Sequence, residues 1–221
     1  MNTRSDLTEP LRQALAVDPG HLDRLHRRLT AAAENEGLLD VAYRTVDSPV
    51  GSLLLAATDR GLVRVAFVGE GHDAVLEMLA RVVSPRILRA PQRLDRAARE
   101  LDEYFAGRRT DFDLAVDLRL AHGFRLEVLR HLREIGYGAT ESYAVVAAAA
   151  GSPRAVRAVG TACATNPVPV VVPCHRVVRS DGTAGAYRGG PEAKLTLLAL
   201  EHRTLAASDP PRKVVETPGC P

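Results

Sequence analysis

The stretch VAYRTVDSPVGSLLLAATDRGLVRVAF, residues 41–67, decides the fold, because it consists of strand-like runs interrupted only by turns. The runs VAYRTV, SLLLAAT and LVRVAF are rich in β-branched and aliphatic residues, and DSPVG and DRG separate them. Short connections of Pro, Gly, Asp and Ser favour tight turns, and tight turns join antiparallel strands. The stretch therefore predicts a hairpin-rich antiparallel sheet.

The chain on either side of this sheet predicts helices. Residues 1–38 are expected to form a helical extension in which Thr8 caps a short helix and DPG at 18–20 breaks it. Leu22, Leu25 and Leu29 then recur with helical spacing. After the sheet, helices are expected over 72–82 and 91–106, followed by extended chain in TDFDLAVDLR at 110–119. Residues 41–118 are thus predicted to form a small α/β domain.

Beyond residue 120 the sequence becomes mainly helical. Phe124, Val128 and Ile135 mark one face of a helix that GYG ends, and Ser142 begins a second helix. Gly-Ser-Pro at 151–153 turns the chain into a third helix over 154–164. Two helices joined by a short glycine-containing turn are the outline of a helix-turn-helix.

A last helix, PEAKLTLLALEH at 191–202, is expected to pack Leu195, Leu198 and Ala199 inward. The tail, residues 206–221, has the composition of disordered chain. The predicted fold class is therefore α+β. An N-terminal α/β domain precedes a mainly helical C-terminal domain over residues 120–205.

Composition limits the function classes. The 221 residues are 46% hydrophobic and carry a net charge of only +2, so a nucleic-acid partner would have to bind at a local basic patch. Three cysteines are too few for a disulfide framework, and their spacing with histidine does not suggest zinc. No signal peptide or apolar run long enough for a membrane is found. We expect a cytoplasmic protein whose thiols stay reduced.

The sequence VVVPCHRVVRSDG, residues 170–182, places Cys174 beside ionisable side chains. A cysteine is nucleophilic only as the thiolate, and His175 can act as its base, directly or through water. Glu201 lies among leucines, where a carboxylate needs a partner. These residues predict a Cys-His-Glu relay. A structural Cys-His pair and a cysteine hydrolase remain alternatives at this point.

The stretch from Arg157 to Glu201 narrows these alternatives, because it carries several motifs in order. They are RAVG, then Asn-Pro, then PCHRV, then Tyr-x-Gly-Gly. From ESY at 141 through Glu201 the chain resembles the C-terminal domain of O6-alkylguanine-DNA alkyltransferases. Residues 41–118 resemble the N-terminal domain of that family more loosely.

The resemblance implies direct reversal of DNA damage, with an alkyl group moving irreversibly from O6 of guanine to Cys174. It implies double-stranded DNA bound through the minor groove and a flipped nucleotide, without cofactor or metal. Asn166 would fix the turn that bears Cys174, and Tyr143 would contact the flipped base. The implied DNA-binding residues are Arg154, Ala155, Arg157, Ala158, Gly160 and Tyr143. The implied substrate pocket contains Val177, Tyr187 and Arg188.

The chain departs from the family pattern at Arg125, Leu129, Gly136, Val156 and Arg188. None of these positions carries a catalytic group, but Arg188 is expected to narrow or charge the pocket rim. Two other functions compete: a lesion-binding protein that signals to excision repair, and a DNA-binding regulator. Retention of Cys174 with His175 and Glu201 argues against the first, and the short N-terminal extension against the second. We expect a monomer associated with the nucleoid.

Overall fold

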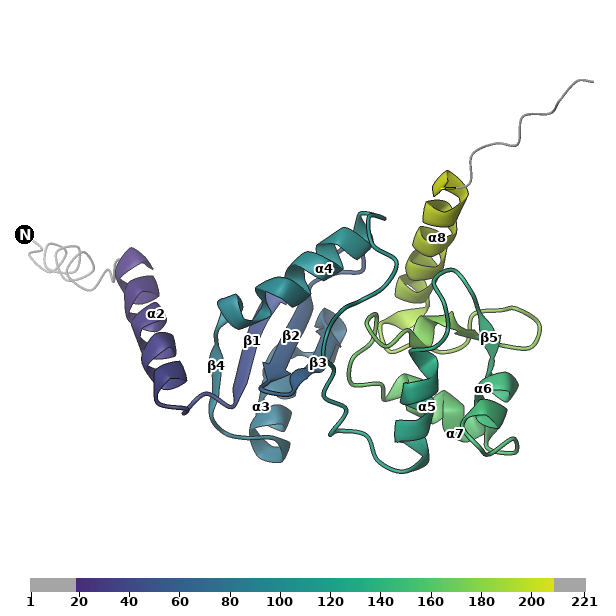
Figure 1. Ribbon diagram of the computed structural model, residues 1–221, viewed down its shortest axis with the longest axis horizontal. Helices are drawn as coiled ribbons and strands as arrows, with labels where there is room; N and C mark the ends of the chain where they lie inside the picture. Colours follow the sequence, from purple (N-terminus) through teal and green to yellow (C-terminus); the bar gives the residue numbers. More distant parts are fainter. Residues whose placement is uncertain (1–18, 209–221) are drawn as a thin grey trace, which may run out of the picture.

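The computed structural model describes residues 19–208 (Figure 1). Its main sheet contains β1 (Val41–Val46), β2 (Leu53–Thr58), β3 (Gly61–Phe67) and β4 (Ile87–Arg89) in the order β3-β2-β1-β4. The strands β1, β2 and β3 pair antiparallel, which confirms the predicted hairpins. The short strand β4 was not predicted. It adds parallel to β1, because the chain returns through a helix before reaching it.

The central strand β2 shows why the sheet carries helices on both faces. All of its residues are buried, and successive side chains point to opposite faces. Leu53 and Leu55 belong to the core on the side of α4 (Asp95–Phe105), together with Leu101. Leu54 belongs to the core on the side of α3 (His72–Val82), together with Leu79. The 3₁₀ turns Val68–Glu70 and Pro91–Leu94 precede these helices.

The segment predicted to be extended, residues 110–119, runs beside β3 and leads to the second half of the molecule (Figure 1). The amide of Leu62 donates to the carbonyl of Ala115 at 2.8 Å, and Asp117 donates back to Leu62 at 2.9 Å. Gly61 has φ of 127°, and a Cβ there would lie 2.3 Å from the Ala115 oxygen. Only glycine therefore permits this approach.

The helical half contains α5 (Phe124–Leu132), β5 (Glu141–Ser142), α6 (Tyr143–Ala149), α7 (Val156–Ala164), the 3₁₀ turn Cys174–Arg176, β6 (Val177–Val178) and α8 (Gly190–Ser208). Two predicted boundaries were wrong. The helix α5 ends at Leu132, although Ile135 is still buried. The helix α7 begins at Val156 with Ala155 as its N-cap, so Arg154 lies in the preceding turn. We call residues 41–118 the sheet unit and residues 119–208 the helical unit.

The inward face of α8 also differs from the prediction. Leu195 is 56% exposed and Ala199 is exposed, whereas Leu197 and Glu201 are fully buried. Lys194 is fully buried as well. The leucine-rich sequence of this helix offers more than one apolar face, and periodicity alone chose the wrong one.

The two ends of the described chain carry predictions with different outcomes. The predicted helix over Leu22, Leu25 and Leu29 is α2 (Pro19–Asn35), and all these leucines are exposed. The predicted cap at Thr8 lies outside the described residues. At the other end α8 extends to Ser208, so the tail predicted from 206 begins inside this helix, and the rest lies outside the described residues. Between residues 19 and 208 no helix has the length and apolarity to cross a membrane.

Candidate active site

Cys174 lies at the end of a buried loop that Asn166 holds in shape. The Asn166 side-chain amide donates to the Val172 carbonyl at 2.8 Å and to the Cys174 Sγ at 3.1 Å. Its Oδ1 accepts from the Val168 amide at 3.0 Å. Val170 has φ of 73°, a strained value for a β-branched residue. The Asn166 bonds and burial of the loop hold this conformation, which places the thiol.

His175 follows Cys174 and binds Glu201 of α8. Its Nε2 lies 2.9 Å from Glu201 Oε1, and both side chains are fully buried. Because the partner is a carboxylate, Nε2 carries the imidazole proton and Nδ1 is left as the acceptor. Nδ1 is buried and makes no hydrogen bond among the described residues. The imidazole is therefore oriented to accept a proton at Nδ1.

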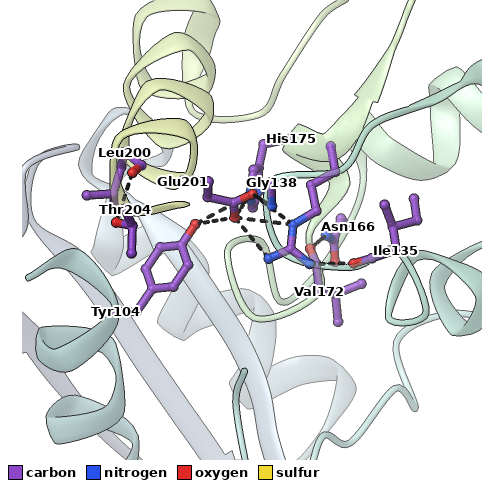
Figure 2. Close-up of polar contacts among 10 residues, drawn as sticks. Tyr104, Ile135, Gly138, Asn166, Val172, His175, Leu200, Glu201 and Thr204 are labelled. Carbon is purple, nitrogen blue, oxygen red and sulfur yellow. Dashed lines mark hydrogen bonds and ion pairs between the residues drawn. The ribbon is translucent and has the colours of Figure 1, made fainter. Parts of the chain in front are cut away.

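Glu201 is the centre of a buried cluster drawn in Figure 2. Arg176 donates to both carboxylate oxygens, at 2.9 and 3.1 Å, and the Gly138 amide donates to Oε2 at 2.9 Å. Tyr104 of α4 donates its hydroxyl to Oε1 at 2.7 Å. Burial alone would raise the pKa of Glu201, but the hydrogen bonds of His175 and Arg176 lower it to about 2. The carboxylate is thus ionised at neutral pH.

Burial and neighbouring groups have opposite effects on the pKa of the Cys174 thiol. Burial raises the pKa of Cys174 to about 11, while the Asn166 hydrogen bond and the Lys194 charge act to lower it. Lys194 donates to the Val177 carbonyl at 2.5 Å and lies 5.9 Å from the centre of the Tyr143 ring. Burial also lowers the pKa of His175, so its imidazole is neutral at neutral pH and, within the described part of the chain, has a free acceptor nitrogen. The resting site therefore pairs a protonated thiol with a neutral base.

Tyr143 and Tyr187 both interact electrostatically with the Cys174 thiol. Tyr143 begins α6 directly after Ser142, whose hydroxyl caps the helix by accepting from Val145. Burial raises the pKa of Tyr143, so its phenol remains a proton donor. A Cβ at Gly185 would lie 2.2 Å from the Tyr143 hydroxyl, so any other residue there would have to displace the Tyr143 side chain. Tyr187 is buried, and burial raises the pKa of its phenol well above the usual value.

The Arg188 side chain is held by the sheet unit, which the sequence did not predict. Its Nε donates to Glu70 Oε2 at 2.5 Å, and its guanidinium also reaches the Ala164 carbonyl at 3.3 Å. Glu70 binds Arg64 of β3 as well. The guanidinium of Arg188 is therefore committed to an ion pair between the units, and not free to charge a pocket rim.

The residues predicted to bind DNA gather at the start of α7. Arg154, Arg157 and Ala158 are exposed, and Ala155 and Gly160 are partly exposed. The buried face of α7 consists of Val159, Ala162 and Cys163. Val156, one of the departures from the family pattern, is 38% exposed and lies outside this buried face. The predicted DNA-binding residues of α7 and of the turn before it are thus accessible, whereas Tyr143 lies at the start of α6 and is partly exposed.

Sequence reasoning missed Tyr104, Lys194 and Glu70. Lys194 lies seven residues before Glu201 on one helix, and that spacing, two turns, was a usable signal. Tyr104 and Glu70 act from the sheet unit, 97 and 118 residues from their partners, and no local pattern connects them.

The structure also accounts for two of the departures from the family pattern. Leu129 is a fully buried core residue, and Arg125 contacts the Thr165 hydroxyl at 3.4 Å. Across residues 19–208 no His, Cys, Asp and Glu side chains group as metal ligands.

Comparison with known proteins adds an independent line of evidence. Two family models match: "6-O-methylguanine DNA methyltransferase, ribonuclease-like domain" over residues 41–118, and the DNA binding domain of the same name over 123–203. A methylated-DNA–protein-cysteine methyltransferase of Mycolicibacterium paratuberculosis is 42% identical over 168 residues, covering 76% of this chain and 96% of that protein. An inducible enzyme of the same name from Bacillus subtilis is 38% identical, covering 71% and 88%.

A crystal structure of Mycobacterium tuberculosis OGT in complex with DNA is also similar to the chain. Its TM-score is 0.64 at 36% sequence identity, and the match covers 74% of this chain and 94% of that one. The similarity thus extends over the sheet unit and the helical unit together.

Proposed function

The chain belongs to the 6-O-methylguanine DNA methyltransferase family, and from that premise we propose that Cys174 is its alkyl acceptor. The activity is that of a methylated-DNA–protein-cysteine methyltransferase: direct-reversal repair of alkylated DNA. The observation that carries the assignment of Cys174 is its hydrogen bond to Asn166 beside the buried His175–Glu201 pair. No observation favours the lesion-binding alternative.

The proposed step begins with proton transfer. The Cys174 proton passes to His175 Nδ1, directly or through one water, and Glu201 stabilises the imidazolium that forms. The thiolate attacks the alkyl carbon, so an S–C bond forms and the C–O6 bond breaks. The electron pair returns to guanine, which gains a proton with the Tyr143 phenol as donor. The product is a thioether, so one molecule repairs one lesion without a cofactor.

The DNA surface is proposed on the same basis. The helices α6 and α7 with the turn between them act as a helix-turn-helix placed in the minor groove. Arg157 fills the stack that the flipped nucleotide leaves, because its planar guanidinium offsets part of the unstacking energy. Ala155, Ala158 and Gly160 allow close approach, and Arg154 contacts the backbone from the turn. Val177, Tyr187 and the Arg188 backbone line the pocket for the alkylated base.

The predicted division of the chain supports this scheme. Residues 120–205 act as the catalytic and DNA-binding domain, residues 41–118 as a supporting α/β domain, and residues 1–38 as an extension of unassigned role. The substrate is DNA and the acceptor is a reduced thiol, which favours the cytoplasm and association with the nucleoid.

The deciding measurement is the intact mass of the protein after incubation with duplex DNA containing O6-methylguanine. Transfer of one methyl group to the thiol adds about 14 Da to the wild type. Cys163→Ser is the matched control, because Cys163 is a second buried cysteine and should leave the shift in place. Cys174→Ser should abolish it. An unshifted wild type that still binds the lesion duplex selectively would favour the damage-binding alternative.

A further inference from the structure

A basic cleft lies between the units, at the C-terminal end of α7. It has a volume of about 390 Å³ and is lined by Arg64, Arg119, His122, Arg125, Thr165 and Arg188, with an apolar wall from α3. Within the described residues no Asp or Glu lines it. The residues around Arg119 and His122 belong to the connection between α4 and α5, which passes between the two units (Figure 1).

The positive charge of the cleft is only partly neutralised. Arg64 and Arg188 share the single carboxylate of Glu70, which lies in the adjoining hollow. Arg119 pairs with the buried Asp117 at 2.6 Å. Among the described residues, the four guanidinium groups of the cleft form ion pairs with two carboxylates, and the charge of Asp40, which pairs with Arg86, also acts on Arg119. The guanidinium groups therefore outnumber the carboxylates paired with them, and net positive charge faces the cleft at neutral pH. The cleft is therefore suited to an anion.

Arg119 and Arg125 are the members best placed to bind that anion. Arg64 is only 2% exposed and already donates to the carbonyls of Val65 and Pro167. Arg119 keeps 32% of its side chain exposed. Within residues 19–208, the one polar partner of the Arg125 side chain is a neutral hydroxyl, that of Thr165, at 3.4 Å. A guanidinium with free N–H groups binds phosphate through paired hydrogen bonds.

The position of the cleft indicates which anion it takes. The exposed side of α7 runs through Arg157, Thr161 and Ala164, and Thr165, which follows the helix, lines the cleft. Nine residues of helix extend over roughly 13 Å, which is about four base-pair steps of duplex DNA. A duplex lying along α7 therefore carries its backbone toward the cleft when Arg157 contacts the flipping site.

We propose that the basic cleft binds a backbone phosphate of the duplex beyond the C-terminal end of α7. The connection between the units thus takes part in DNA binding together with the helix-turn-helix. This inference rests on the proposed function, since it takes its ligand from that function. Contacts to phosphate fix register and add affinity without reading sequence, so the cleft strengthens binding to damaged and undamaged duplexes alike.

The test compares Arg125→Gln and Arg119→Gln with Arg108→Gln. Arg108 is an exposed arginine that pairs with Asp102 and does not line the cleft. Duplex affinity is measured over about 50 to 200 mM salt, and removing one phosphate-binding arginine should reduce the slope of log affinity against log salt by about 1. Arg125→Lys keeps the charge and should retain most of the slope. Unfolding midpoints identify any variant that fails to fold, and each arginine gives an independent readout.

Alkyl transfer from the free base O6-benzylguanine separates the two proposals, because this substrate has no phosphate. Both cleft variants should modify Cys174 with the free base as fast as the Arg108→Gln control does. If their salt slopes equal that of Arg108→Gln while transfer persists, the cleft proposal is wrong and the proposed function stands. If the wild type transfers neither from the free base nor from lesion duplex, the proposed function itself is wrong.

Discussion

At the scale of single residues, the Cys174 thiol of the resting site has a higher pKa than an ordinary cysteine, so it is less acidic. Its reactivity must therefore come from neighbours that stabilise the charged form when the substrate is in place, which is an arrangement that also limits unwanted oxidation of Cys174. Asn166 is the neighbour in direct contact with sulfur. The hydrogen-bond donor and the base thus contribute separately to activation.

Asn166→Ala should raise the pKa of Cys174 above its value of about 11, because the Asn166 hydrogen bond lowers it. The substitution also leaves the buried Val168 amide without its partner, at a cost of about 1–3 kcal/mol, whereas the Val172 carbonyl keeps its bond from the Cys174 amide. The measurement is thiolate absorbance against pH in a Cys163→Ser background, with alkyl transfer followed in parallel. An unchanged titration would show that Asn166 supports the loop only.

Acid stability should depend on Glu201. Its pKa is about 2 when folded and near the usual 4.5 when unfolded, so the unfolded chain binds the proton first. The lowered pKa of Glu201 adds of order 3 kcal/mol to the free energy of unfolding. This stabilisation is fully present above about pH 4.5 and is lost as the pH falls toward 2. Denaturant unfolding between pH 4.5 and 2 should show that the free energy of unfolding falls more steeply for the wild type than for Glu201→Gln. Parallel declines would contradict the assignment.

At the scale of elements, the sequence predicted the hairpins, α3, α4 and the extended segment well, because each has a clear local period. The prediction failed where the spacing of apolar residues in the sequence does not reveal which of them are buried in the fold. On α8 the leucines at 195, 197, 198 and 200 point to several faces of the helix, so the tertiary contacts of Lys194 and Glu201 decide which face is buried. The strand β4 is three residues long and has no period to detect.

The corrected face of α8 leads to a paired stability prediction. Leu197→Ala should destabilise the fold by about 2–5 kcal/mol, because the side chain is fully buried and leaves a cavity. Leu195→Ala, two residues away and 56% exposed, should change stability by less than about 1 kcal/mol. Urea midpoints of both variants measure the difference. Equal losses of stability would mean that Leu195 is packed inward, as the sequence analysis expected.

At the scale of the whole molecule, the sheet unit completes the active site of the helical unit. Phe67 of β3 packs edge-on against Tyr187, with ring centres 5.7 Å apart, and a Cβ at Gly189 would lie 2.7 Å from the Phe67 ring. Glu70 holds Arg188, and Tyr104 reaches Glu201. The residues that lie close together in sequence, Asn166, Cys174 and His175, were predictable from their motifs. These contacts between the units were not, because they join segments with no shared pattern.

The Tyr104 hydroxyl gives the sharpest test of this dependence. Tyr104→Phe removes one hydrogen bond from Glu201 and the 3.4 Å contact of the same hydroxyl to His175 Nε2. It leaves the bonds of Glu201 to His175, Arg176 and Gly138 in place. We expect a loss of about 1–3 kcal/mol in stability, since the bond is buried and charge-assisted, and slower alkyl transfer from free base and duplex alike. Tyr43→Phe on β1, outside the cluster, is the matched control and should transfer at the wild-type rate.

A purely structural role of Tyr104 would also lower stability, so the deciding readout is a double-mutant cycle on the transfer rate. If Tyr104 acts by orienting Glu201, its removal should matter little once Glu201→Gln has already weakened the relay. The two effects should then be coupled by about 0.5–3 kcal/mol in activation free energy. Additive effects would mean that the hydroxyl does not act through Glu201. Coupling would make the sheet unit a working part of the relay that activates Cys174.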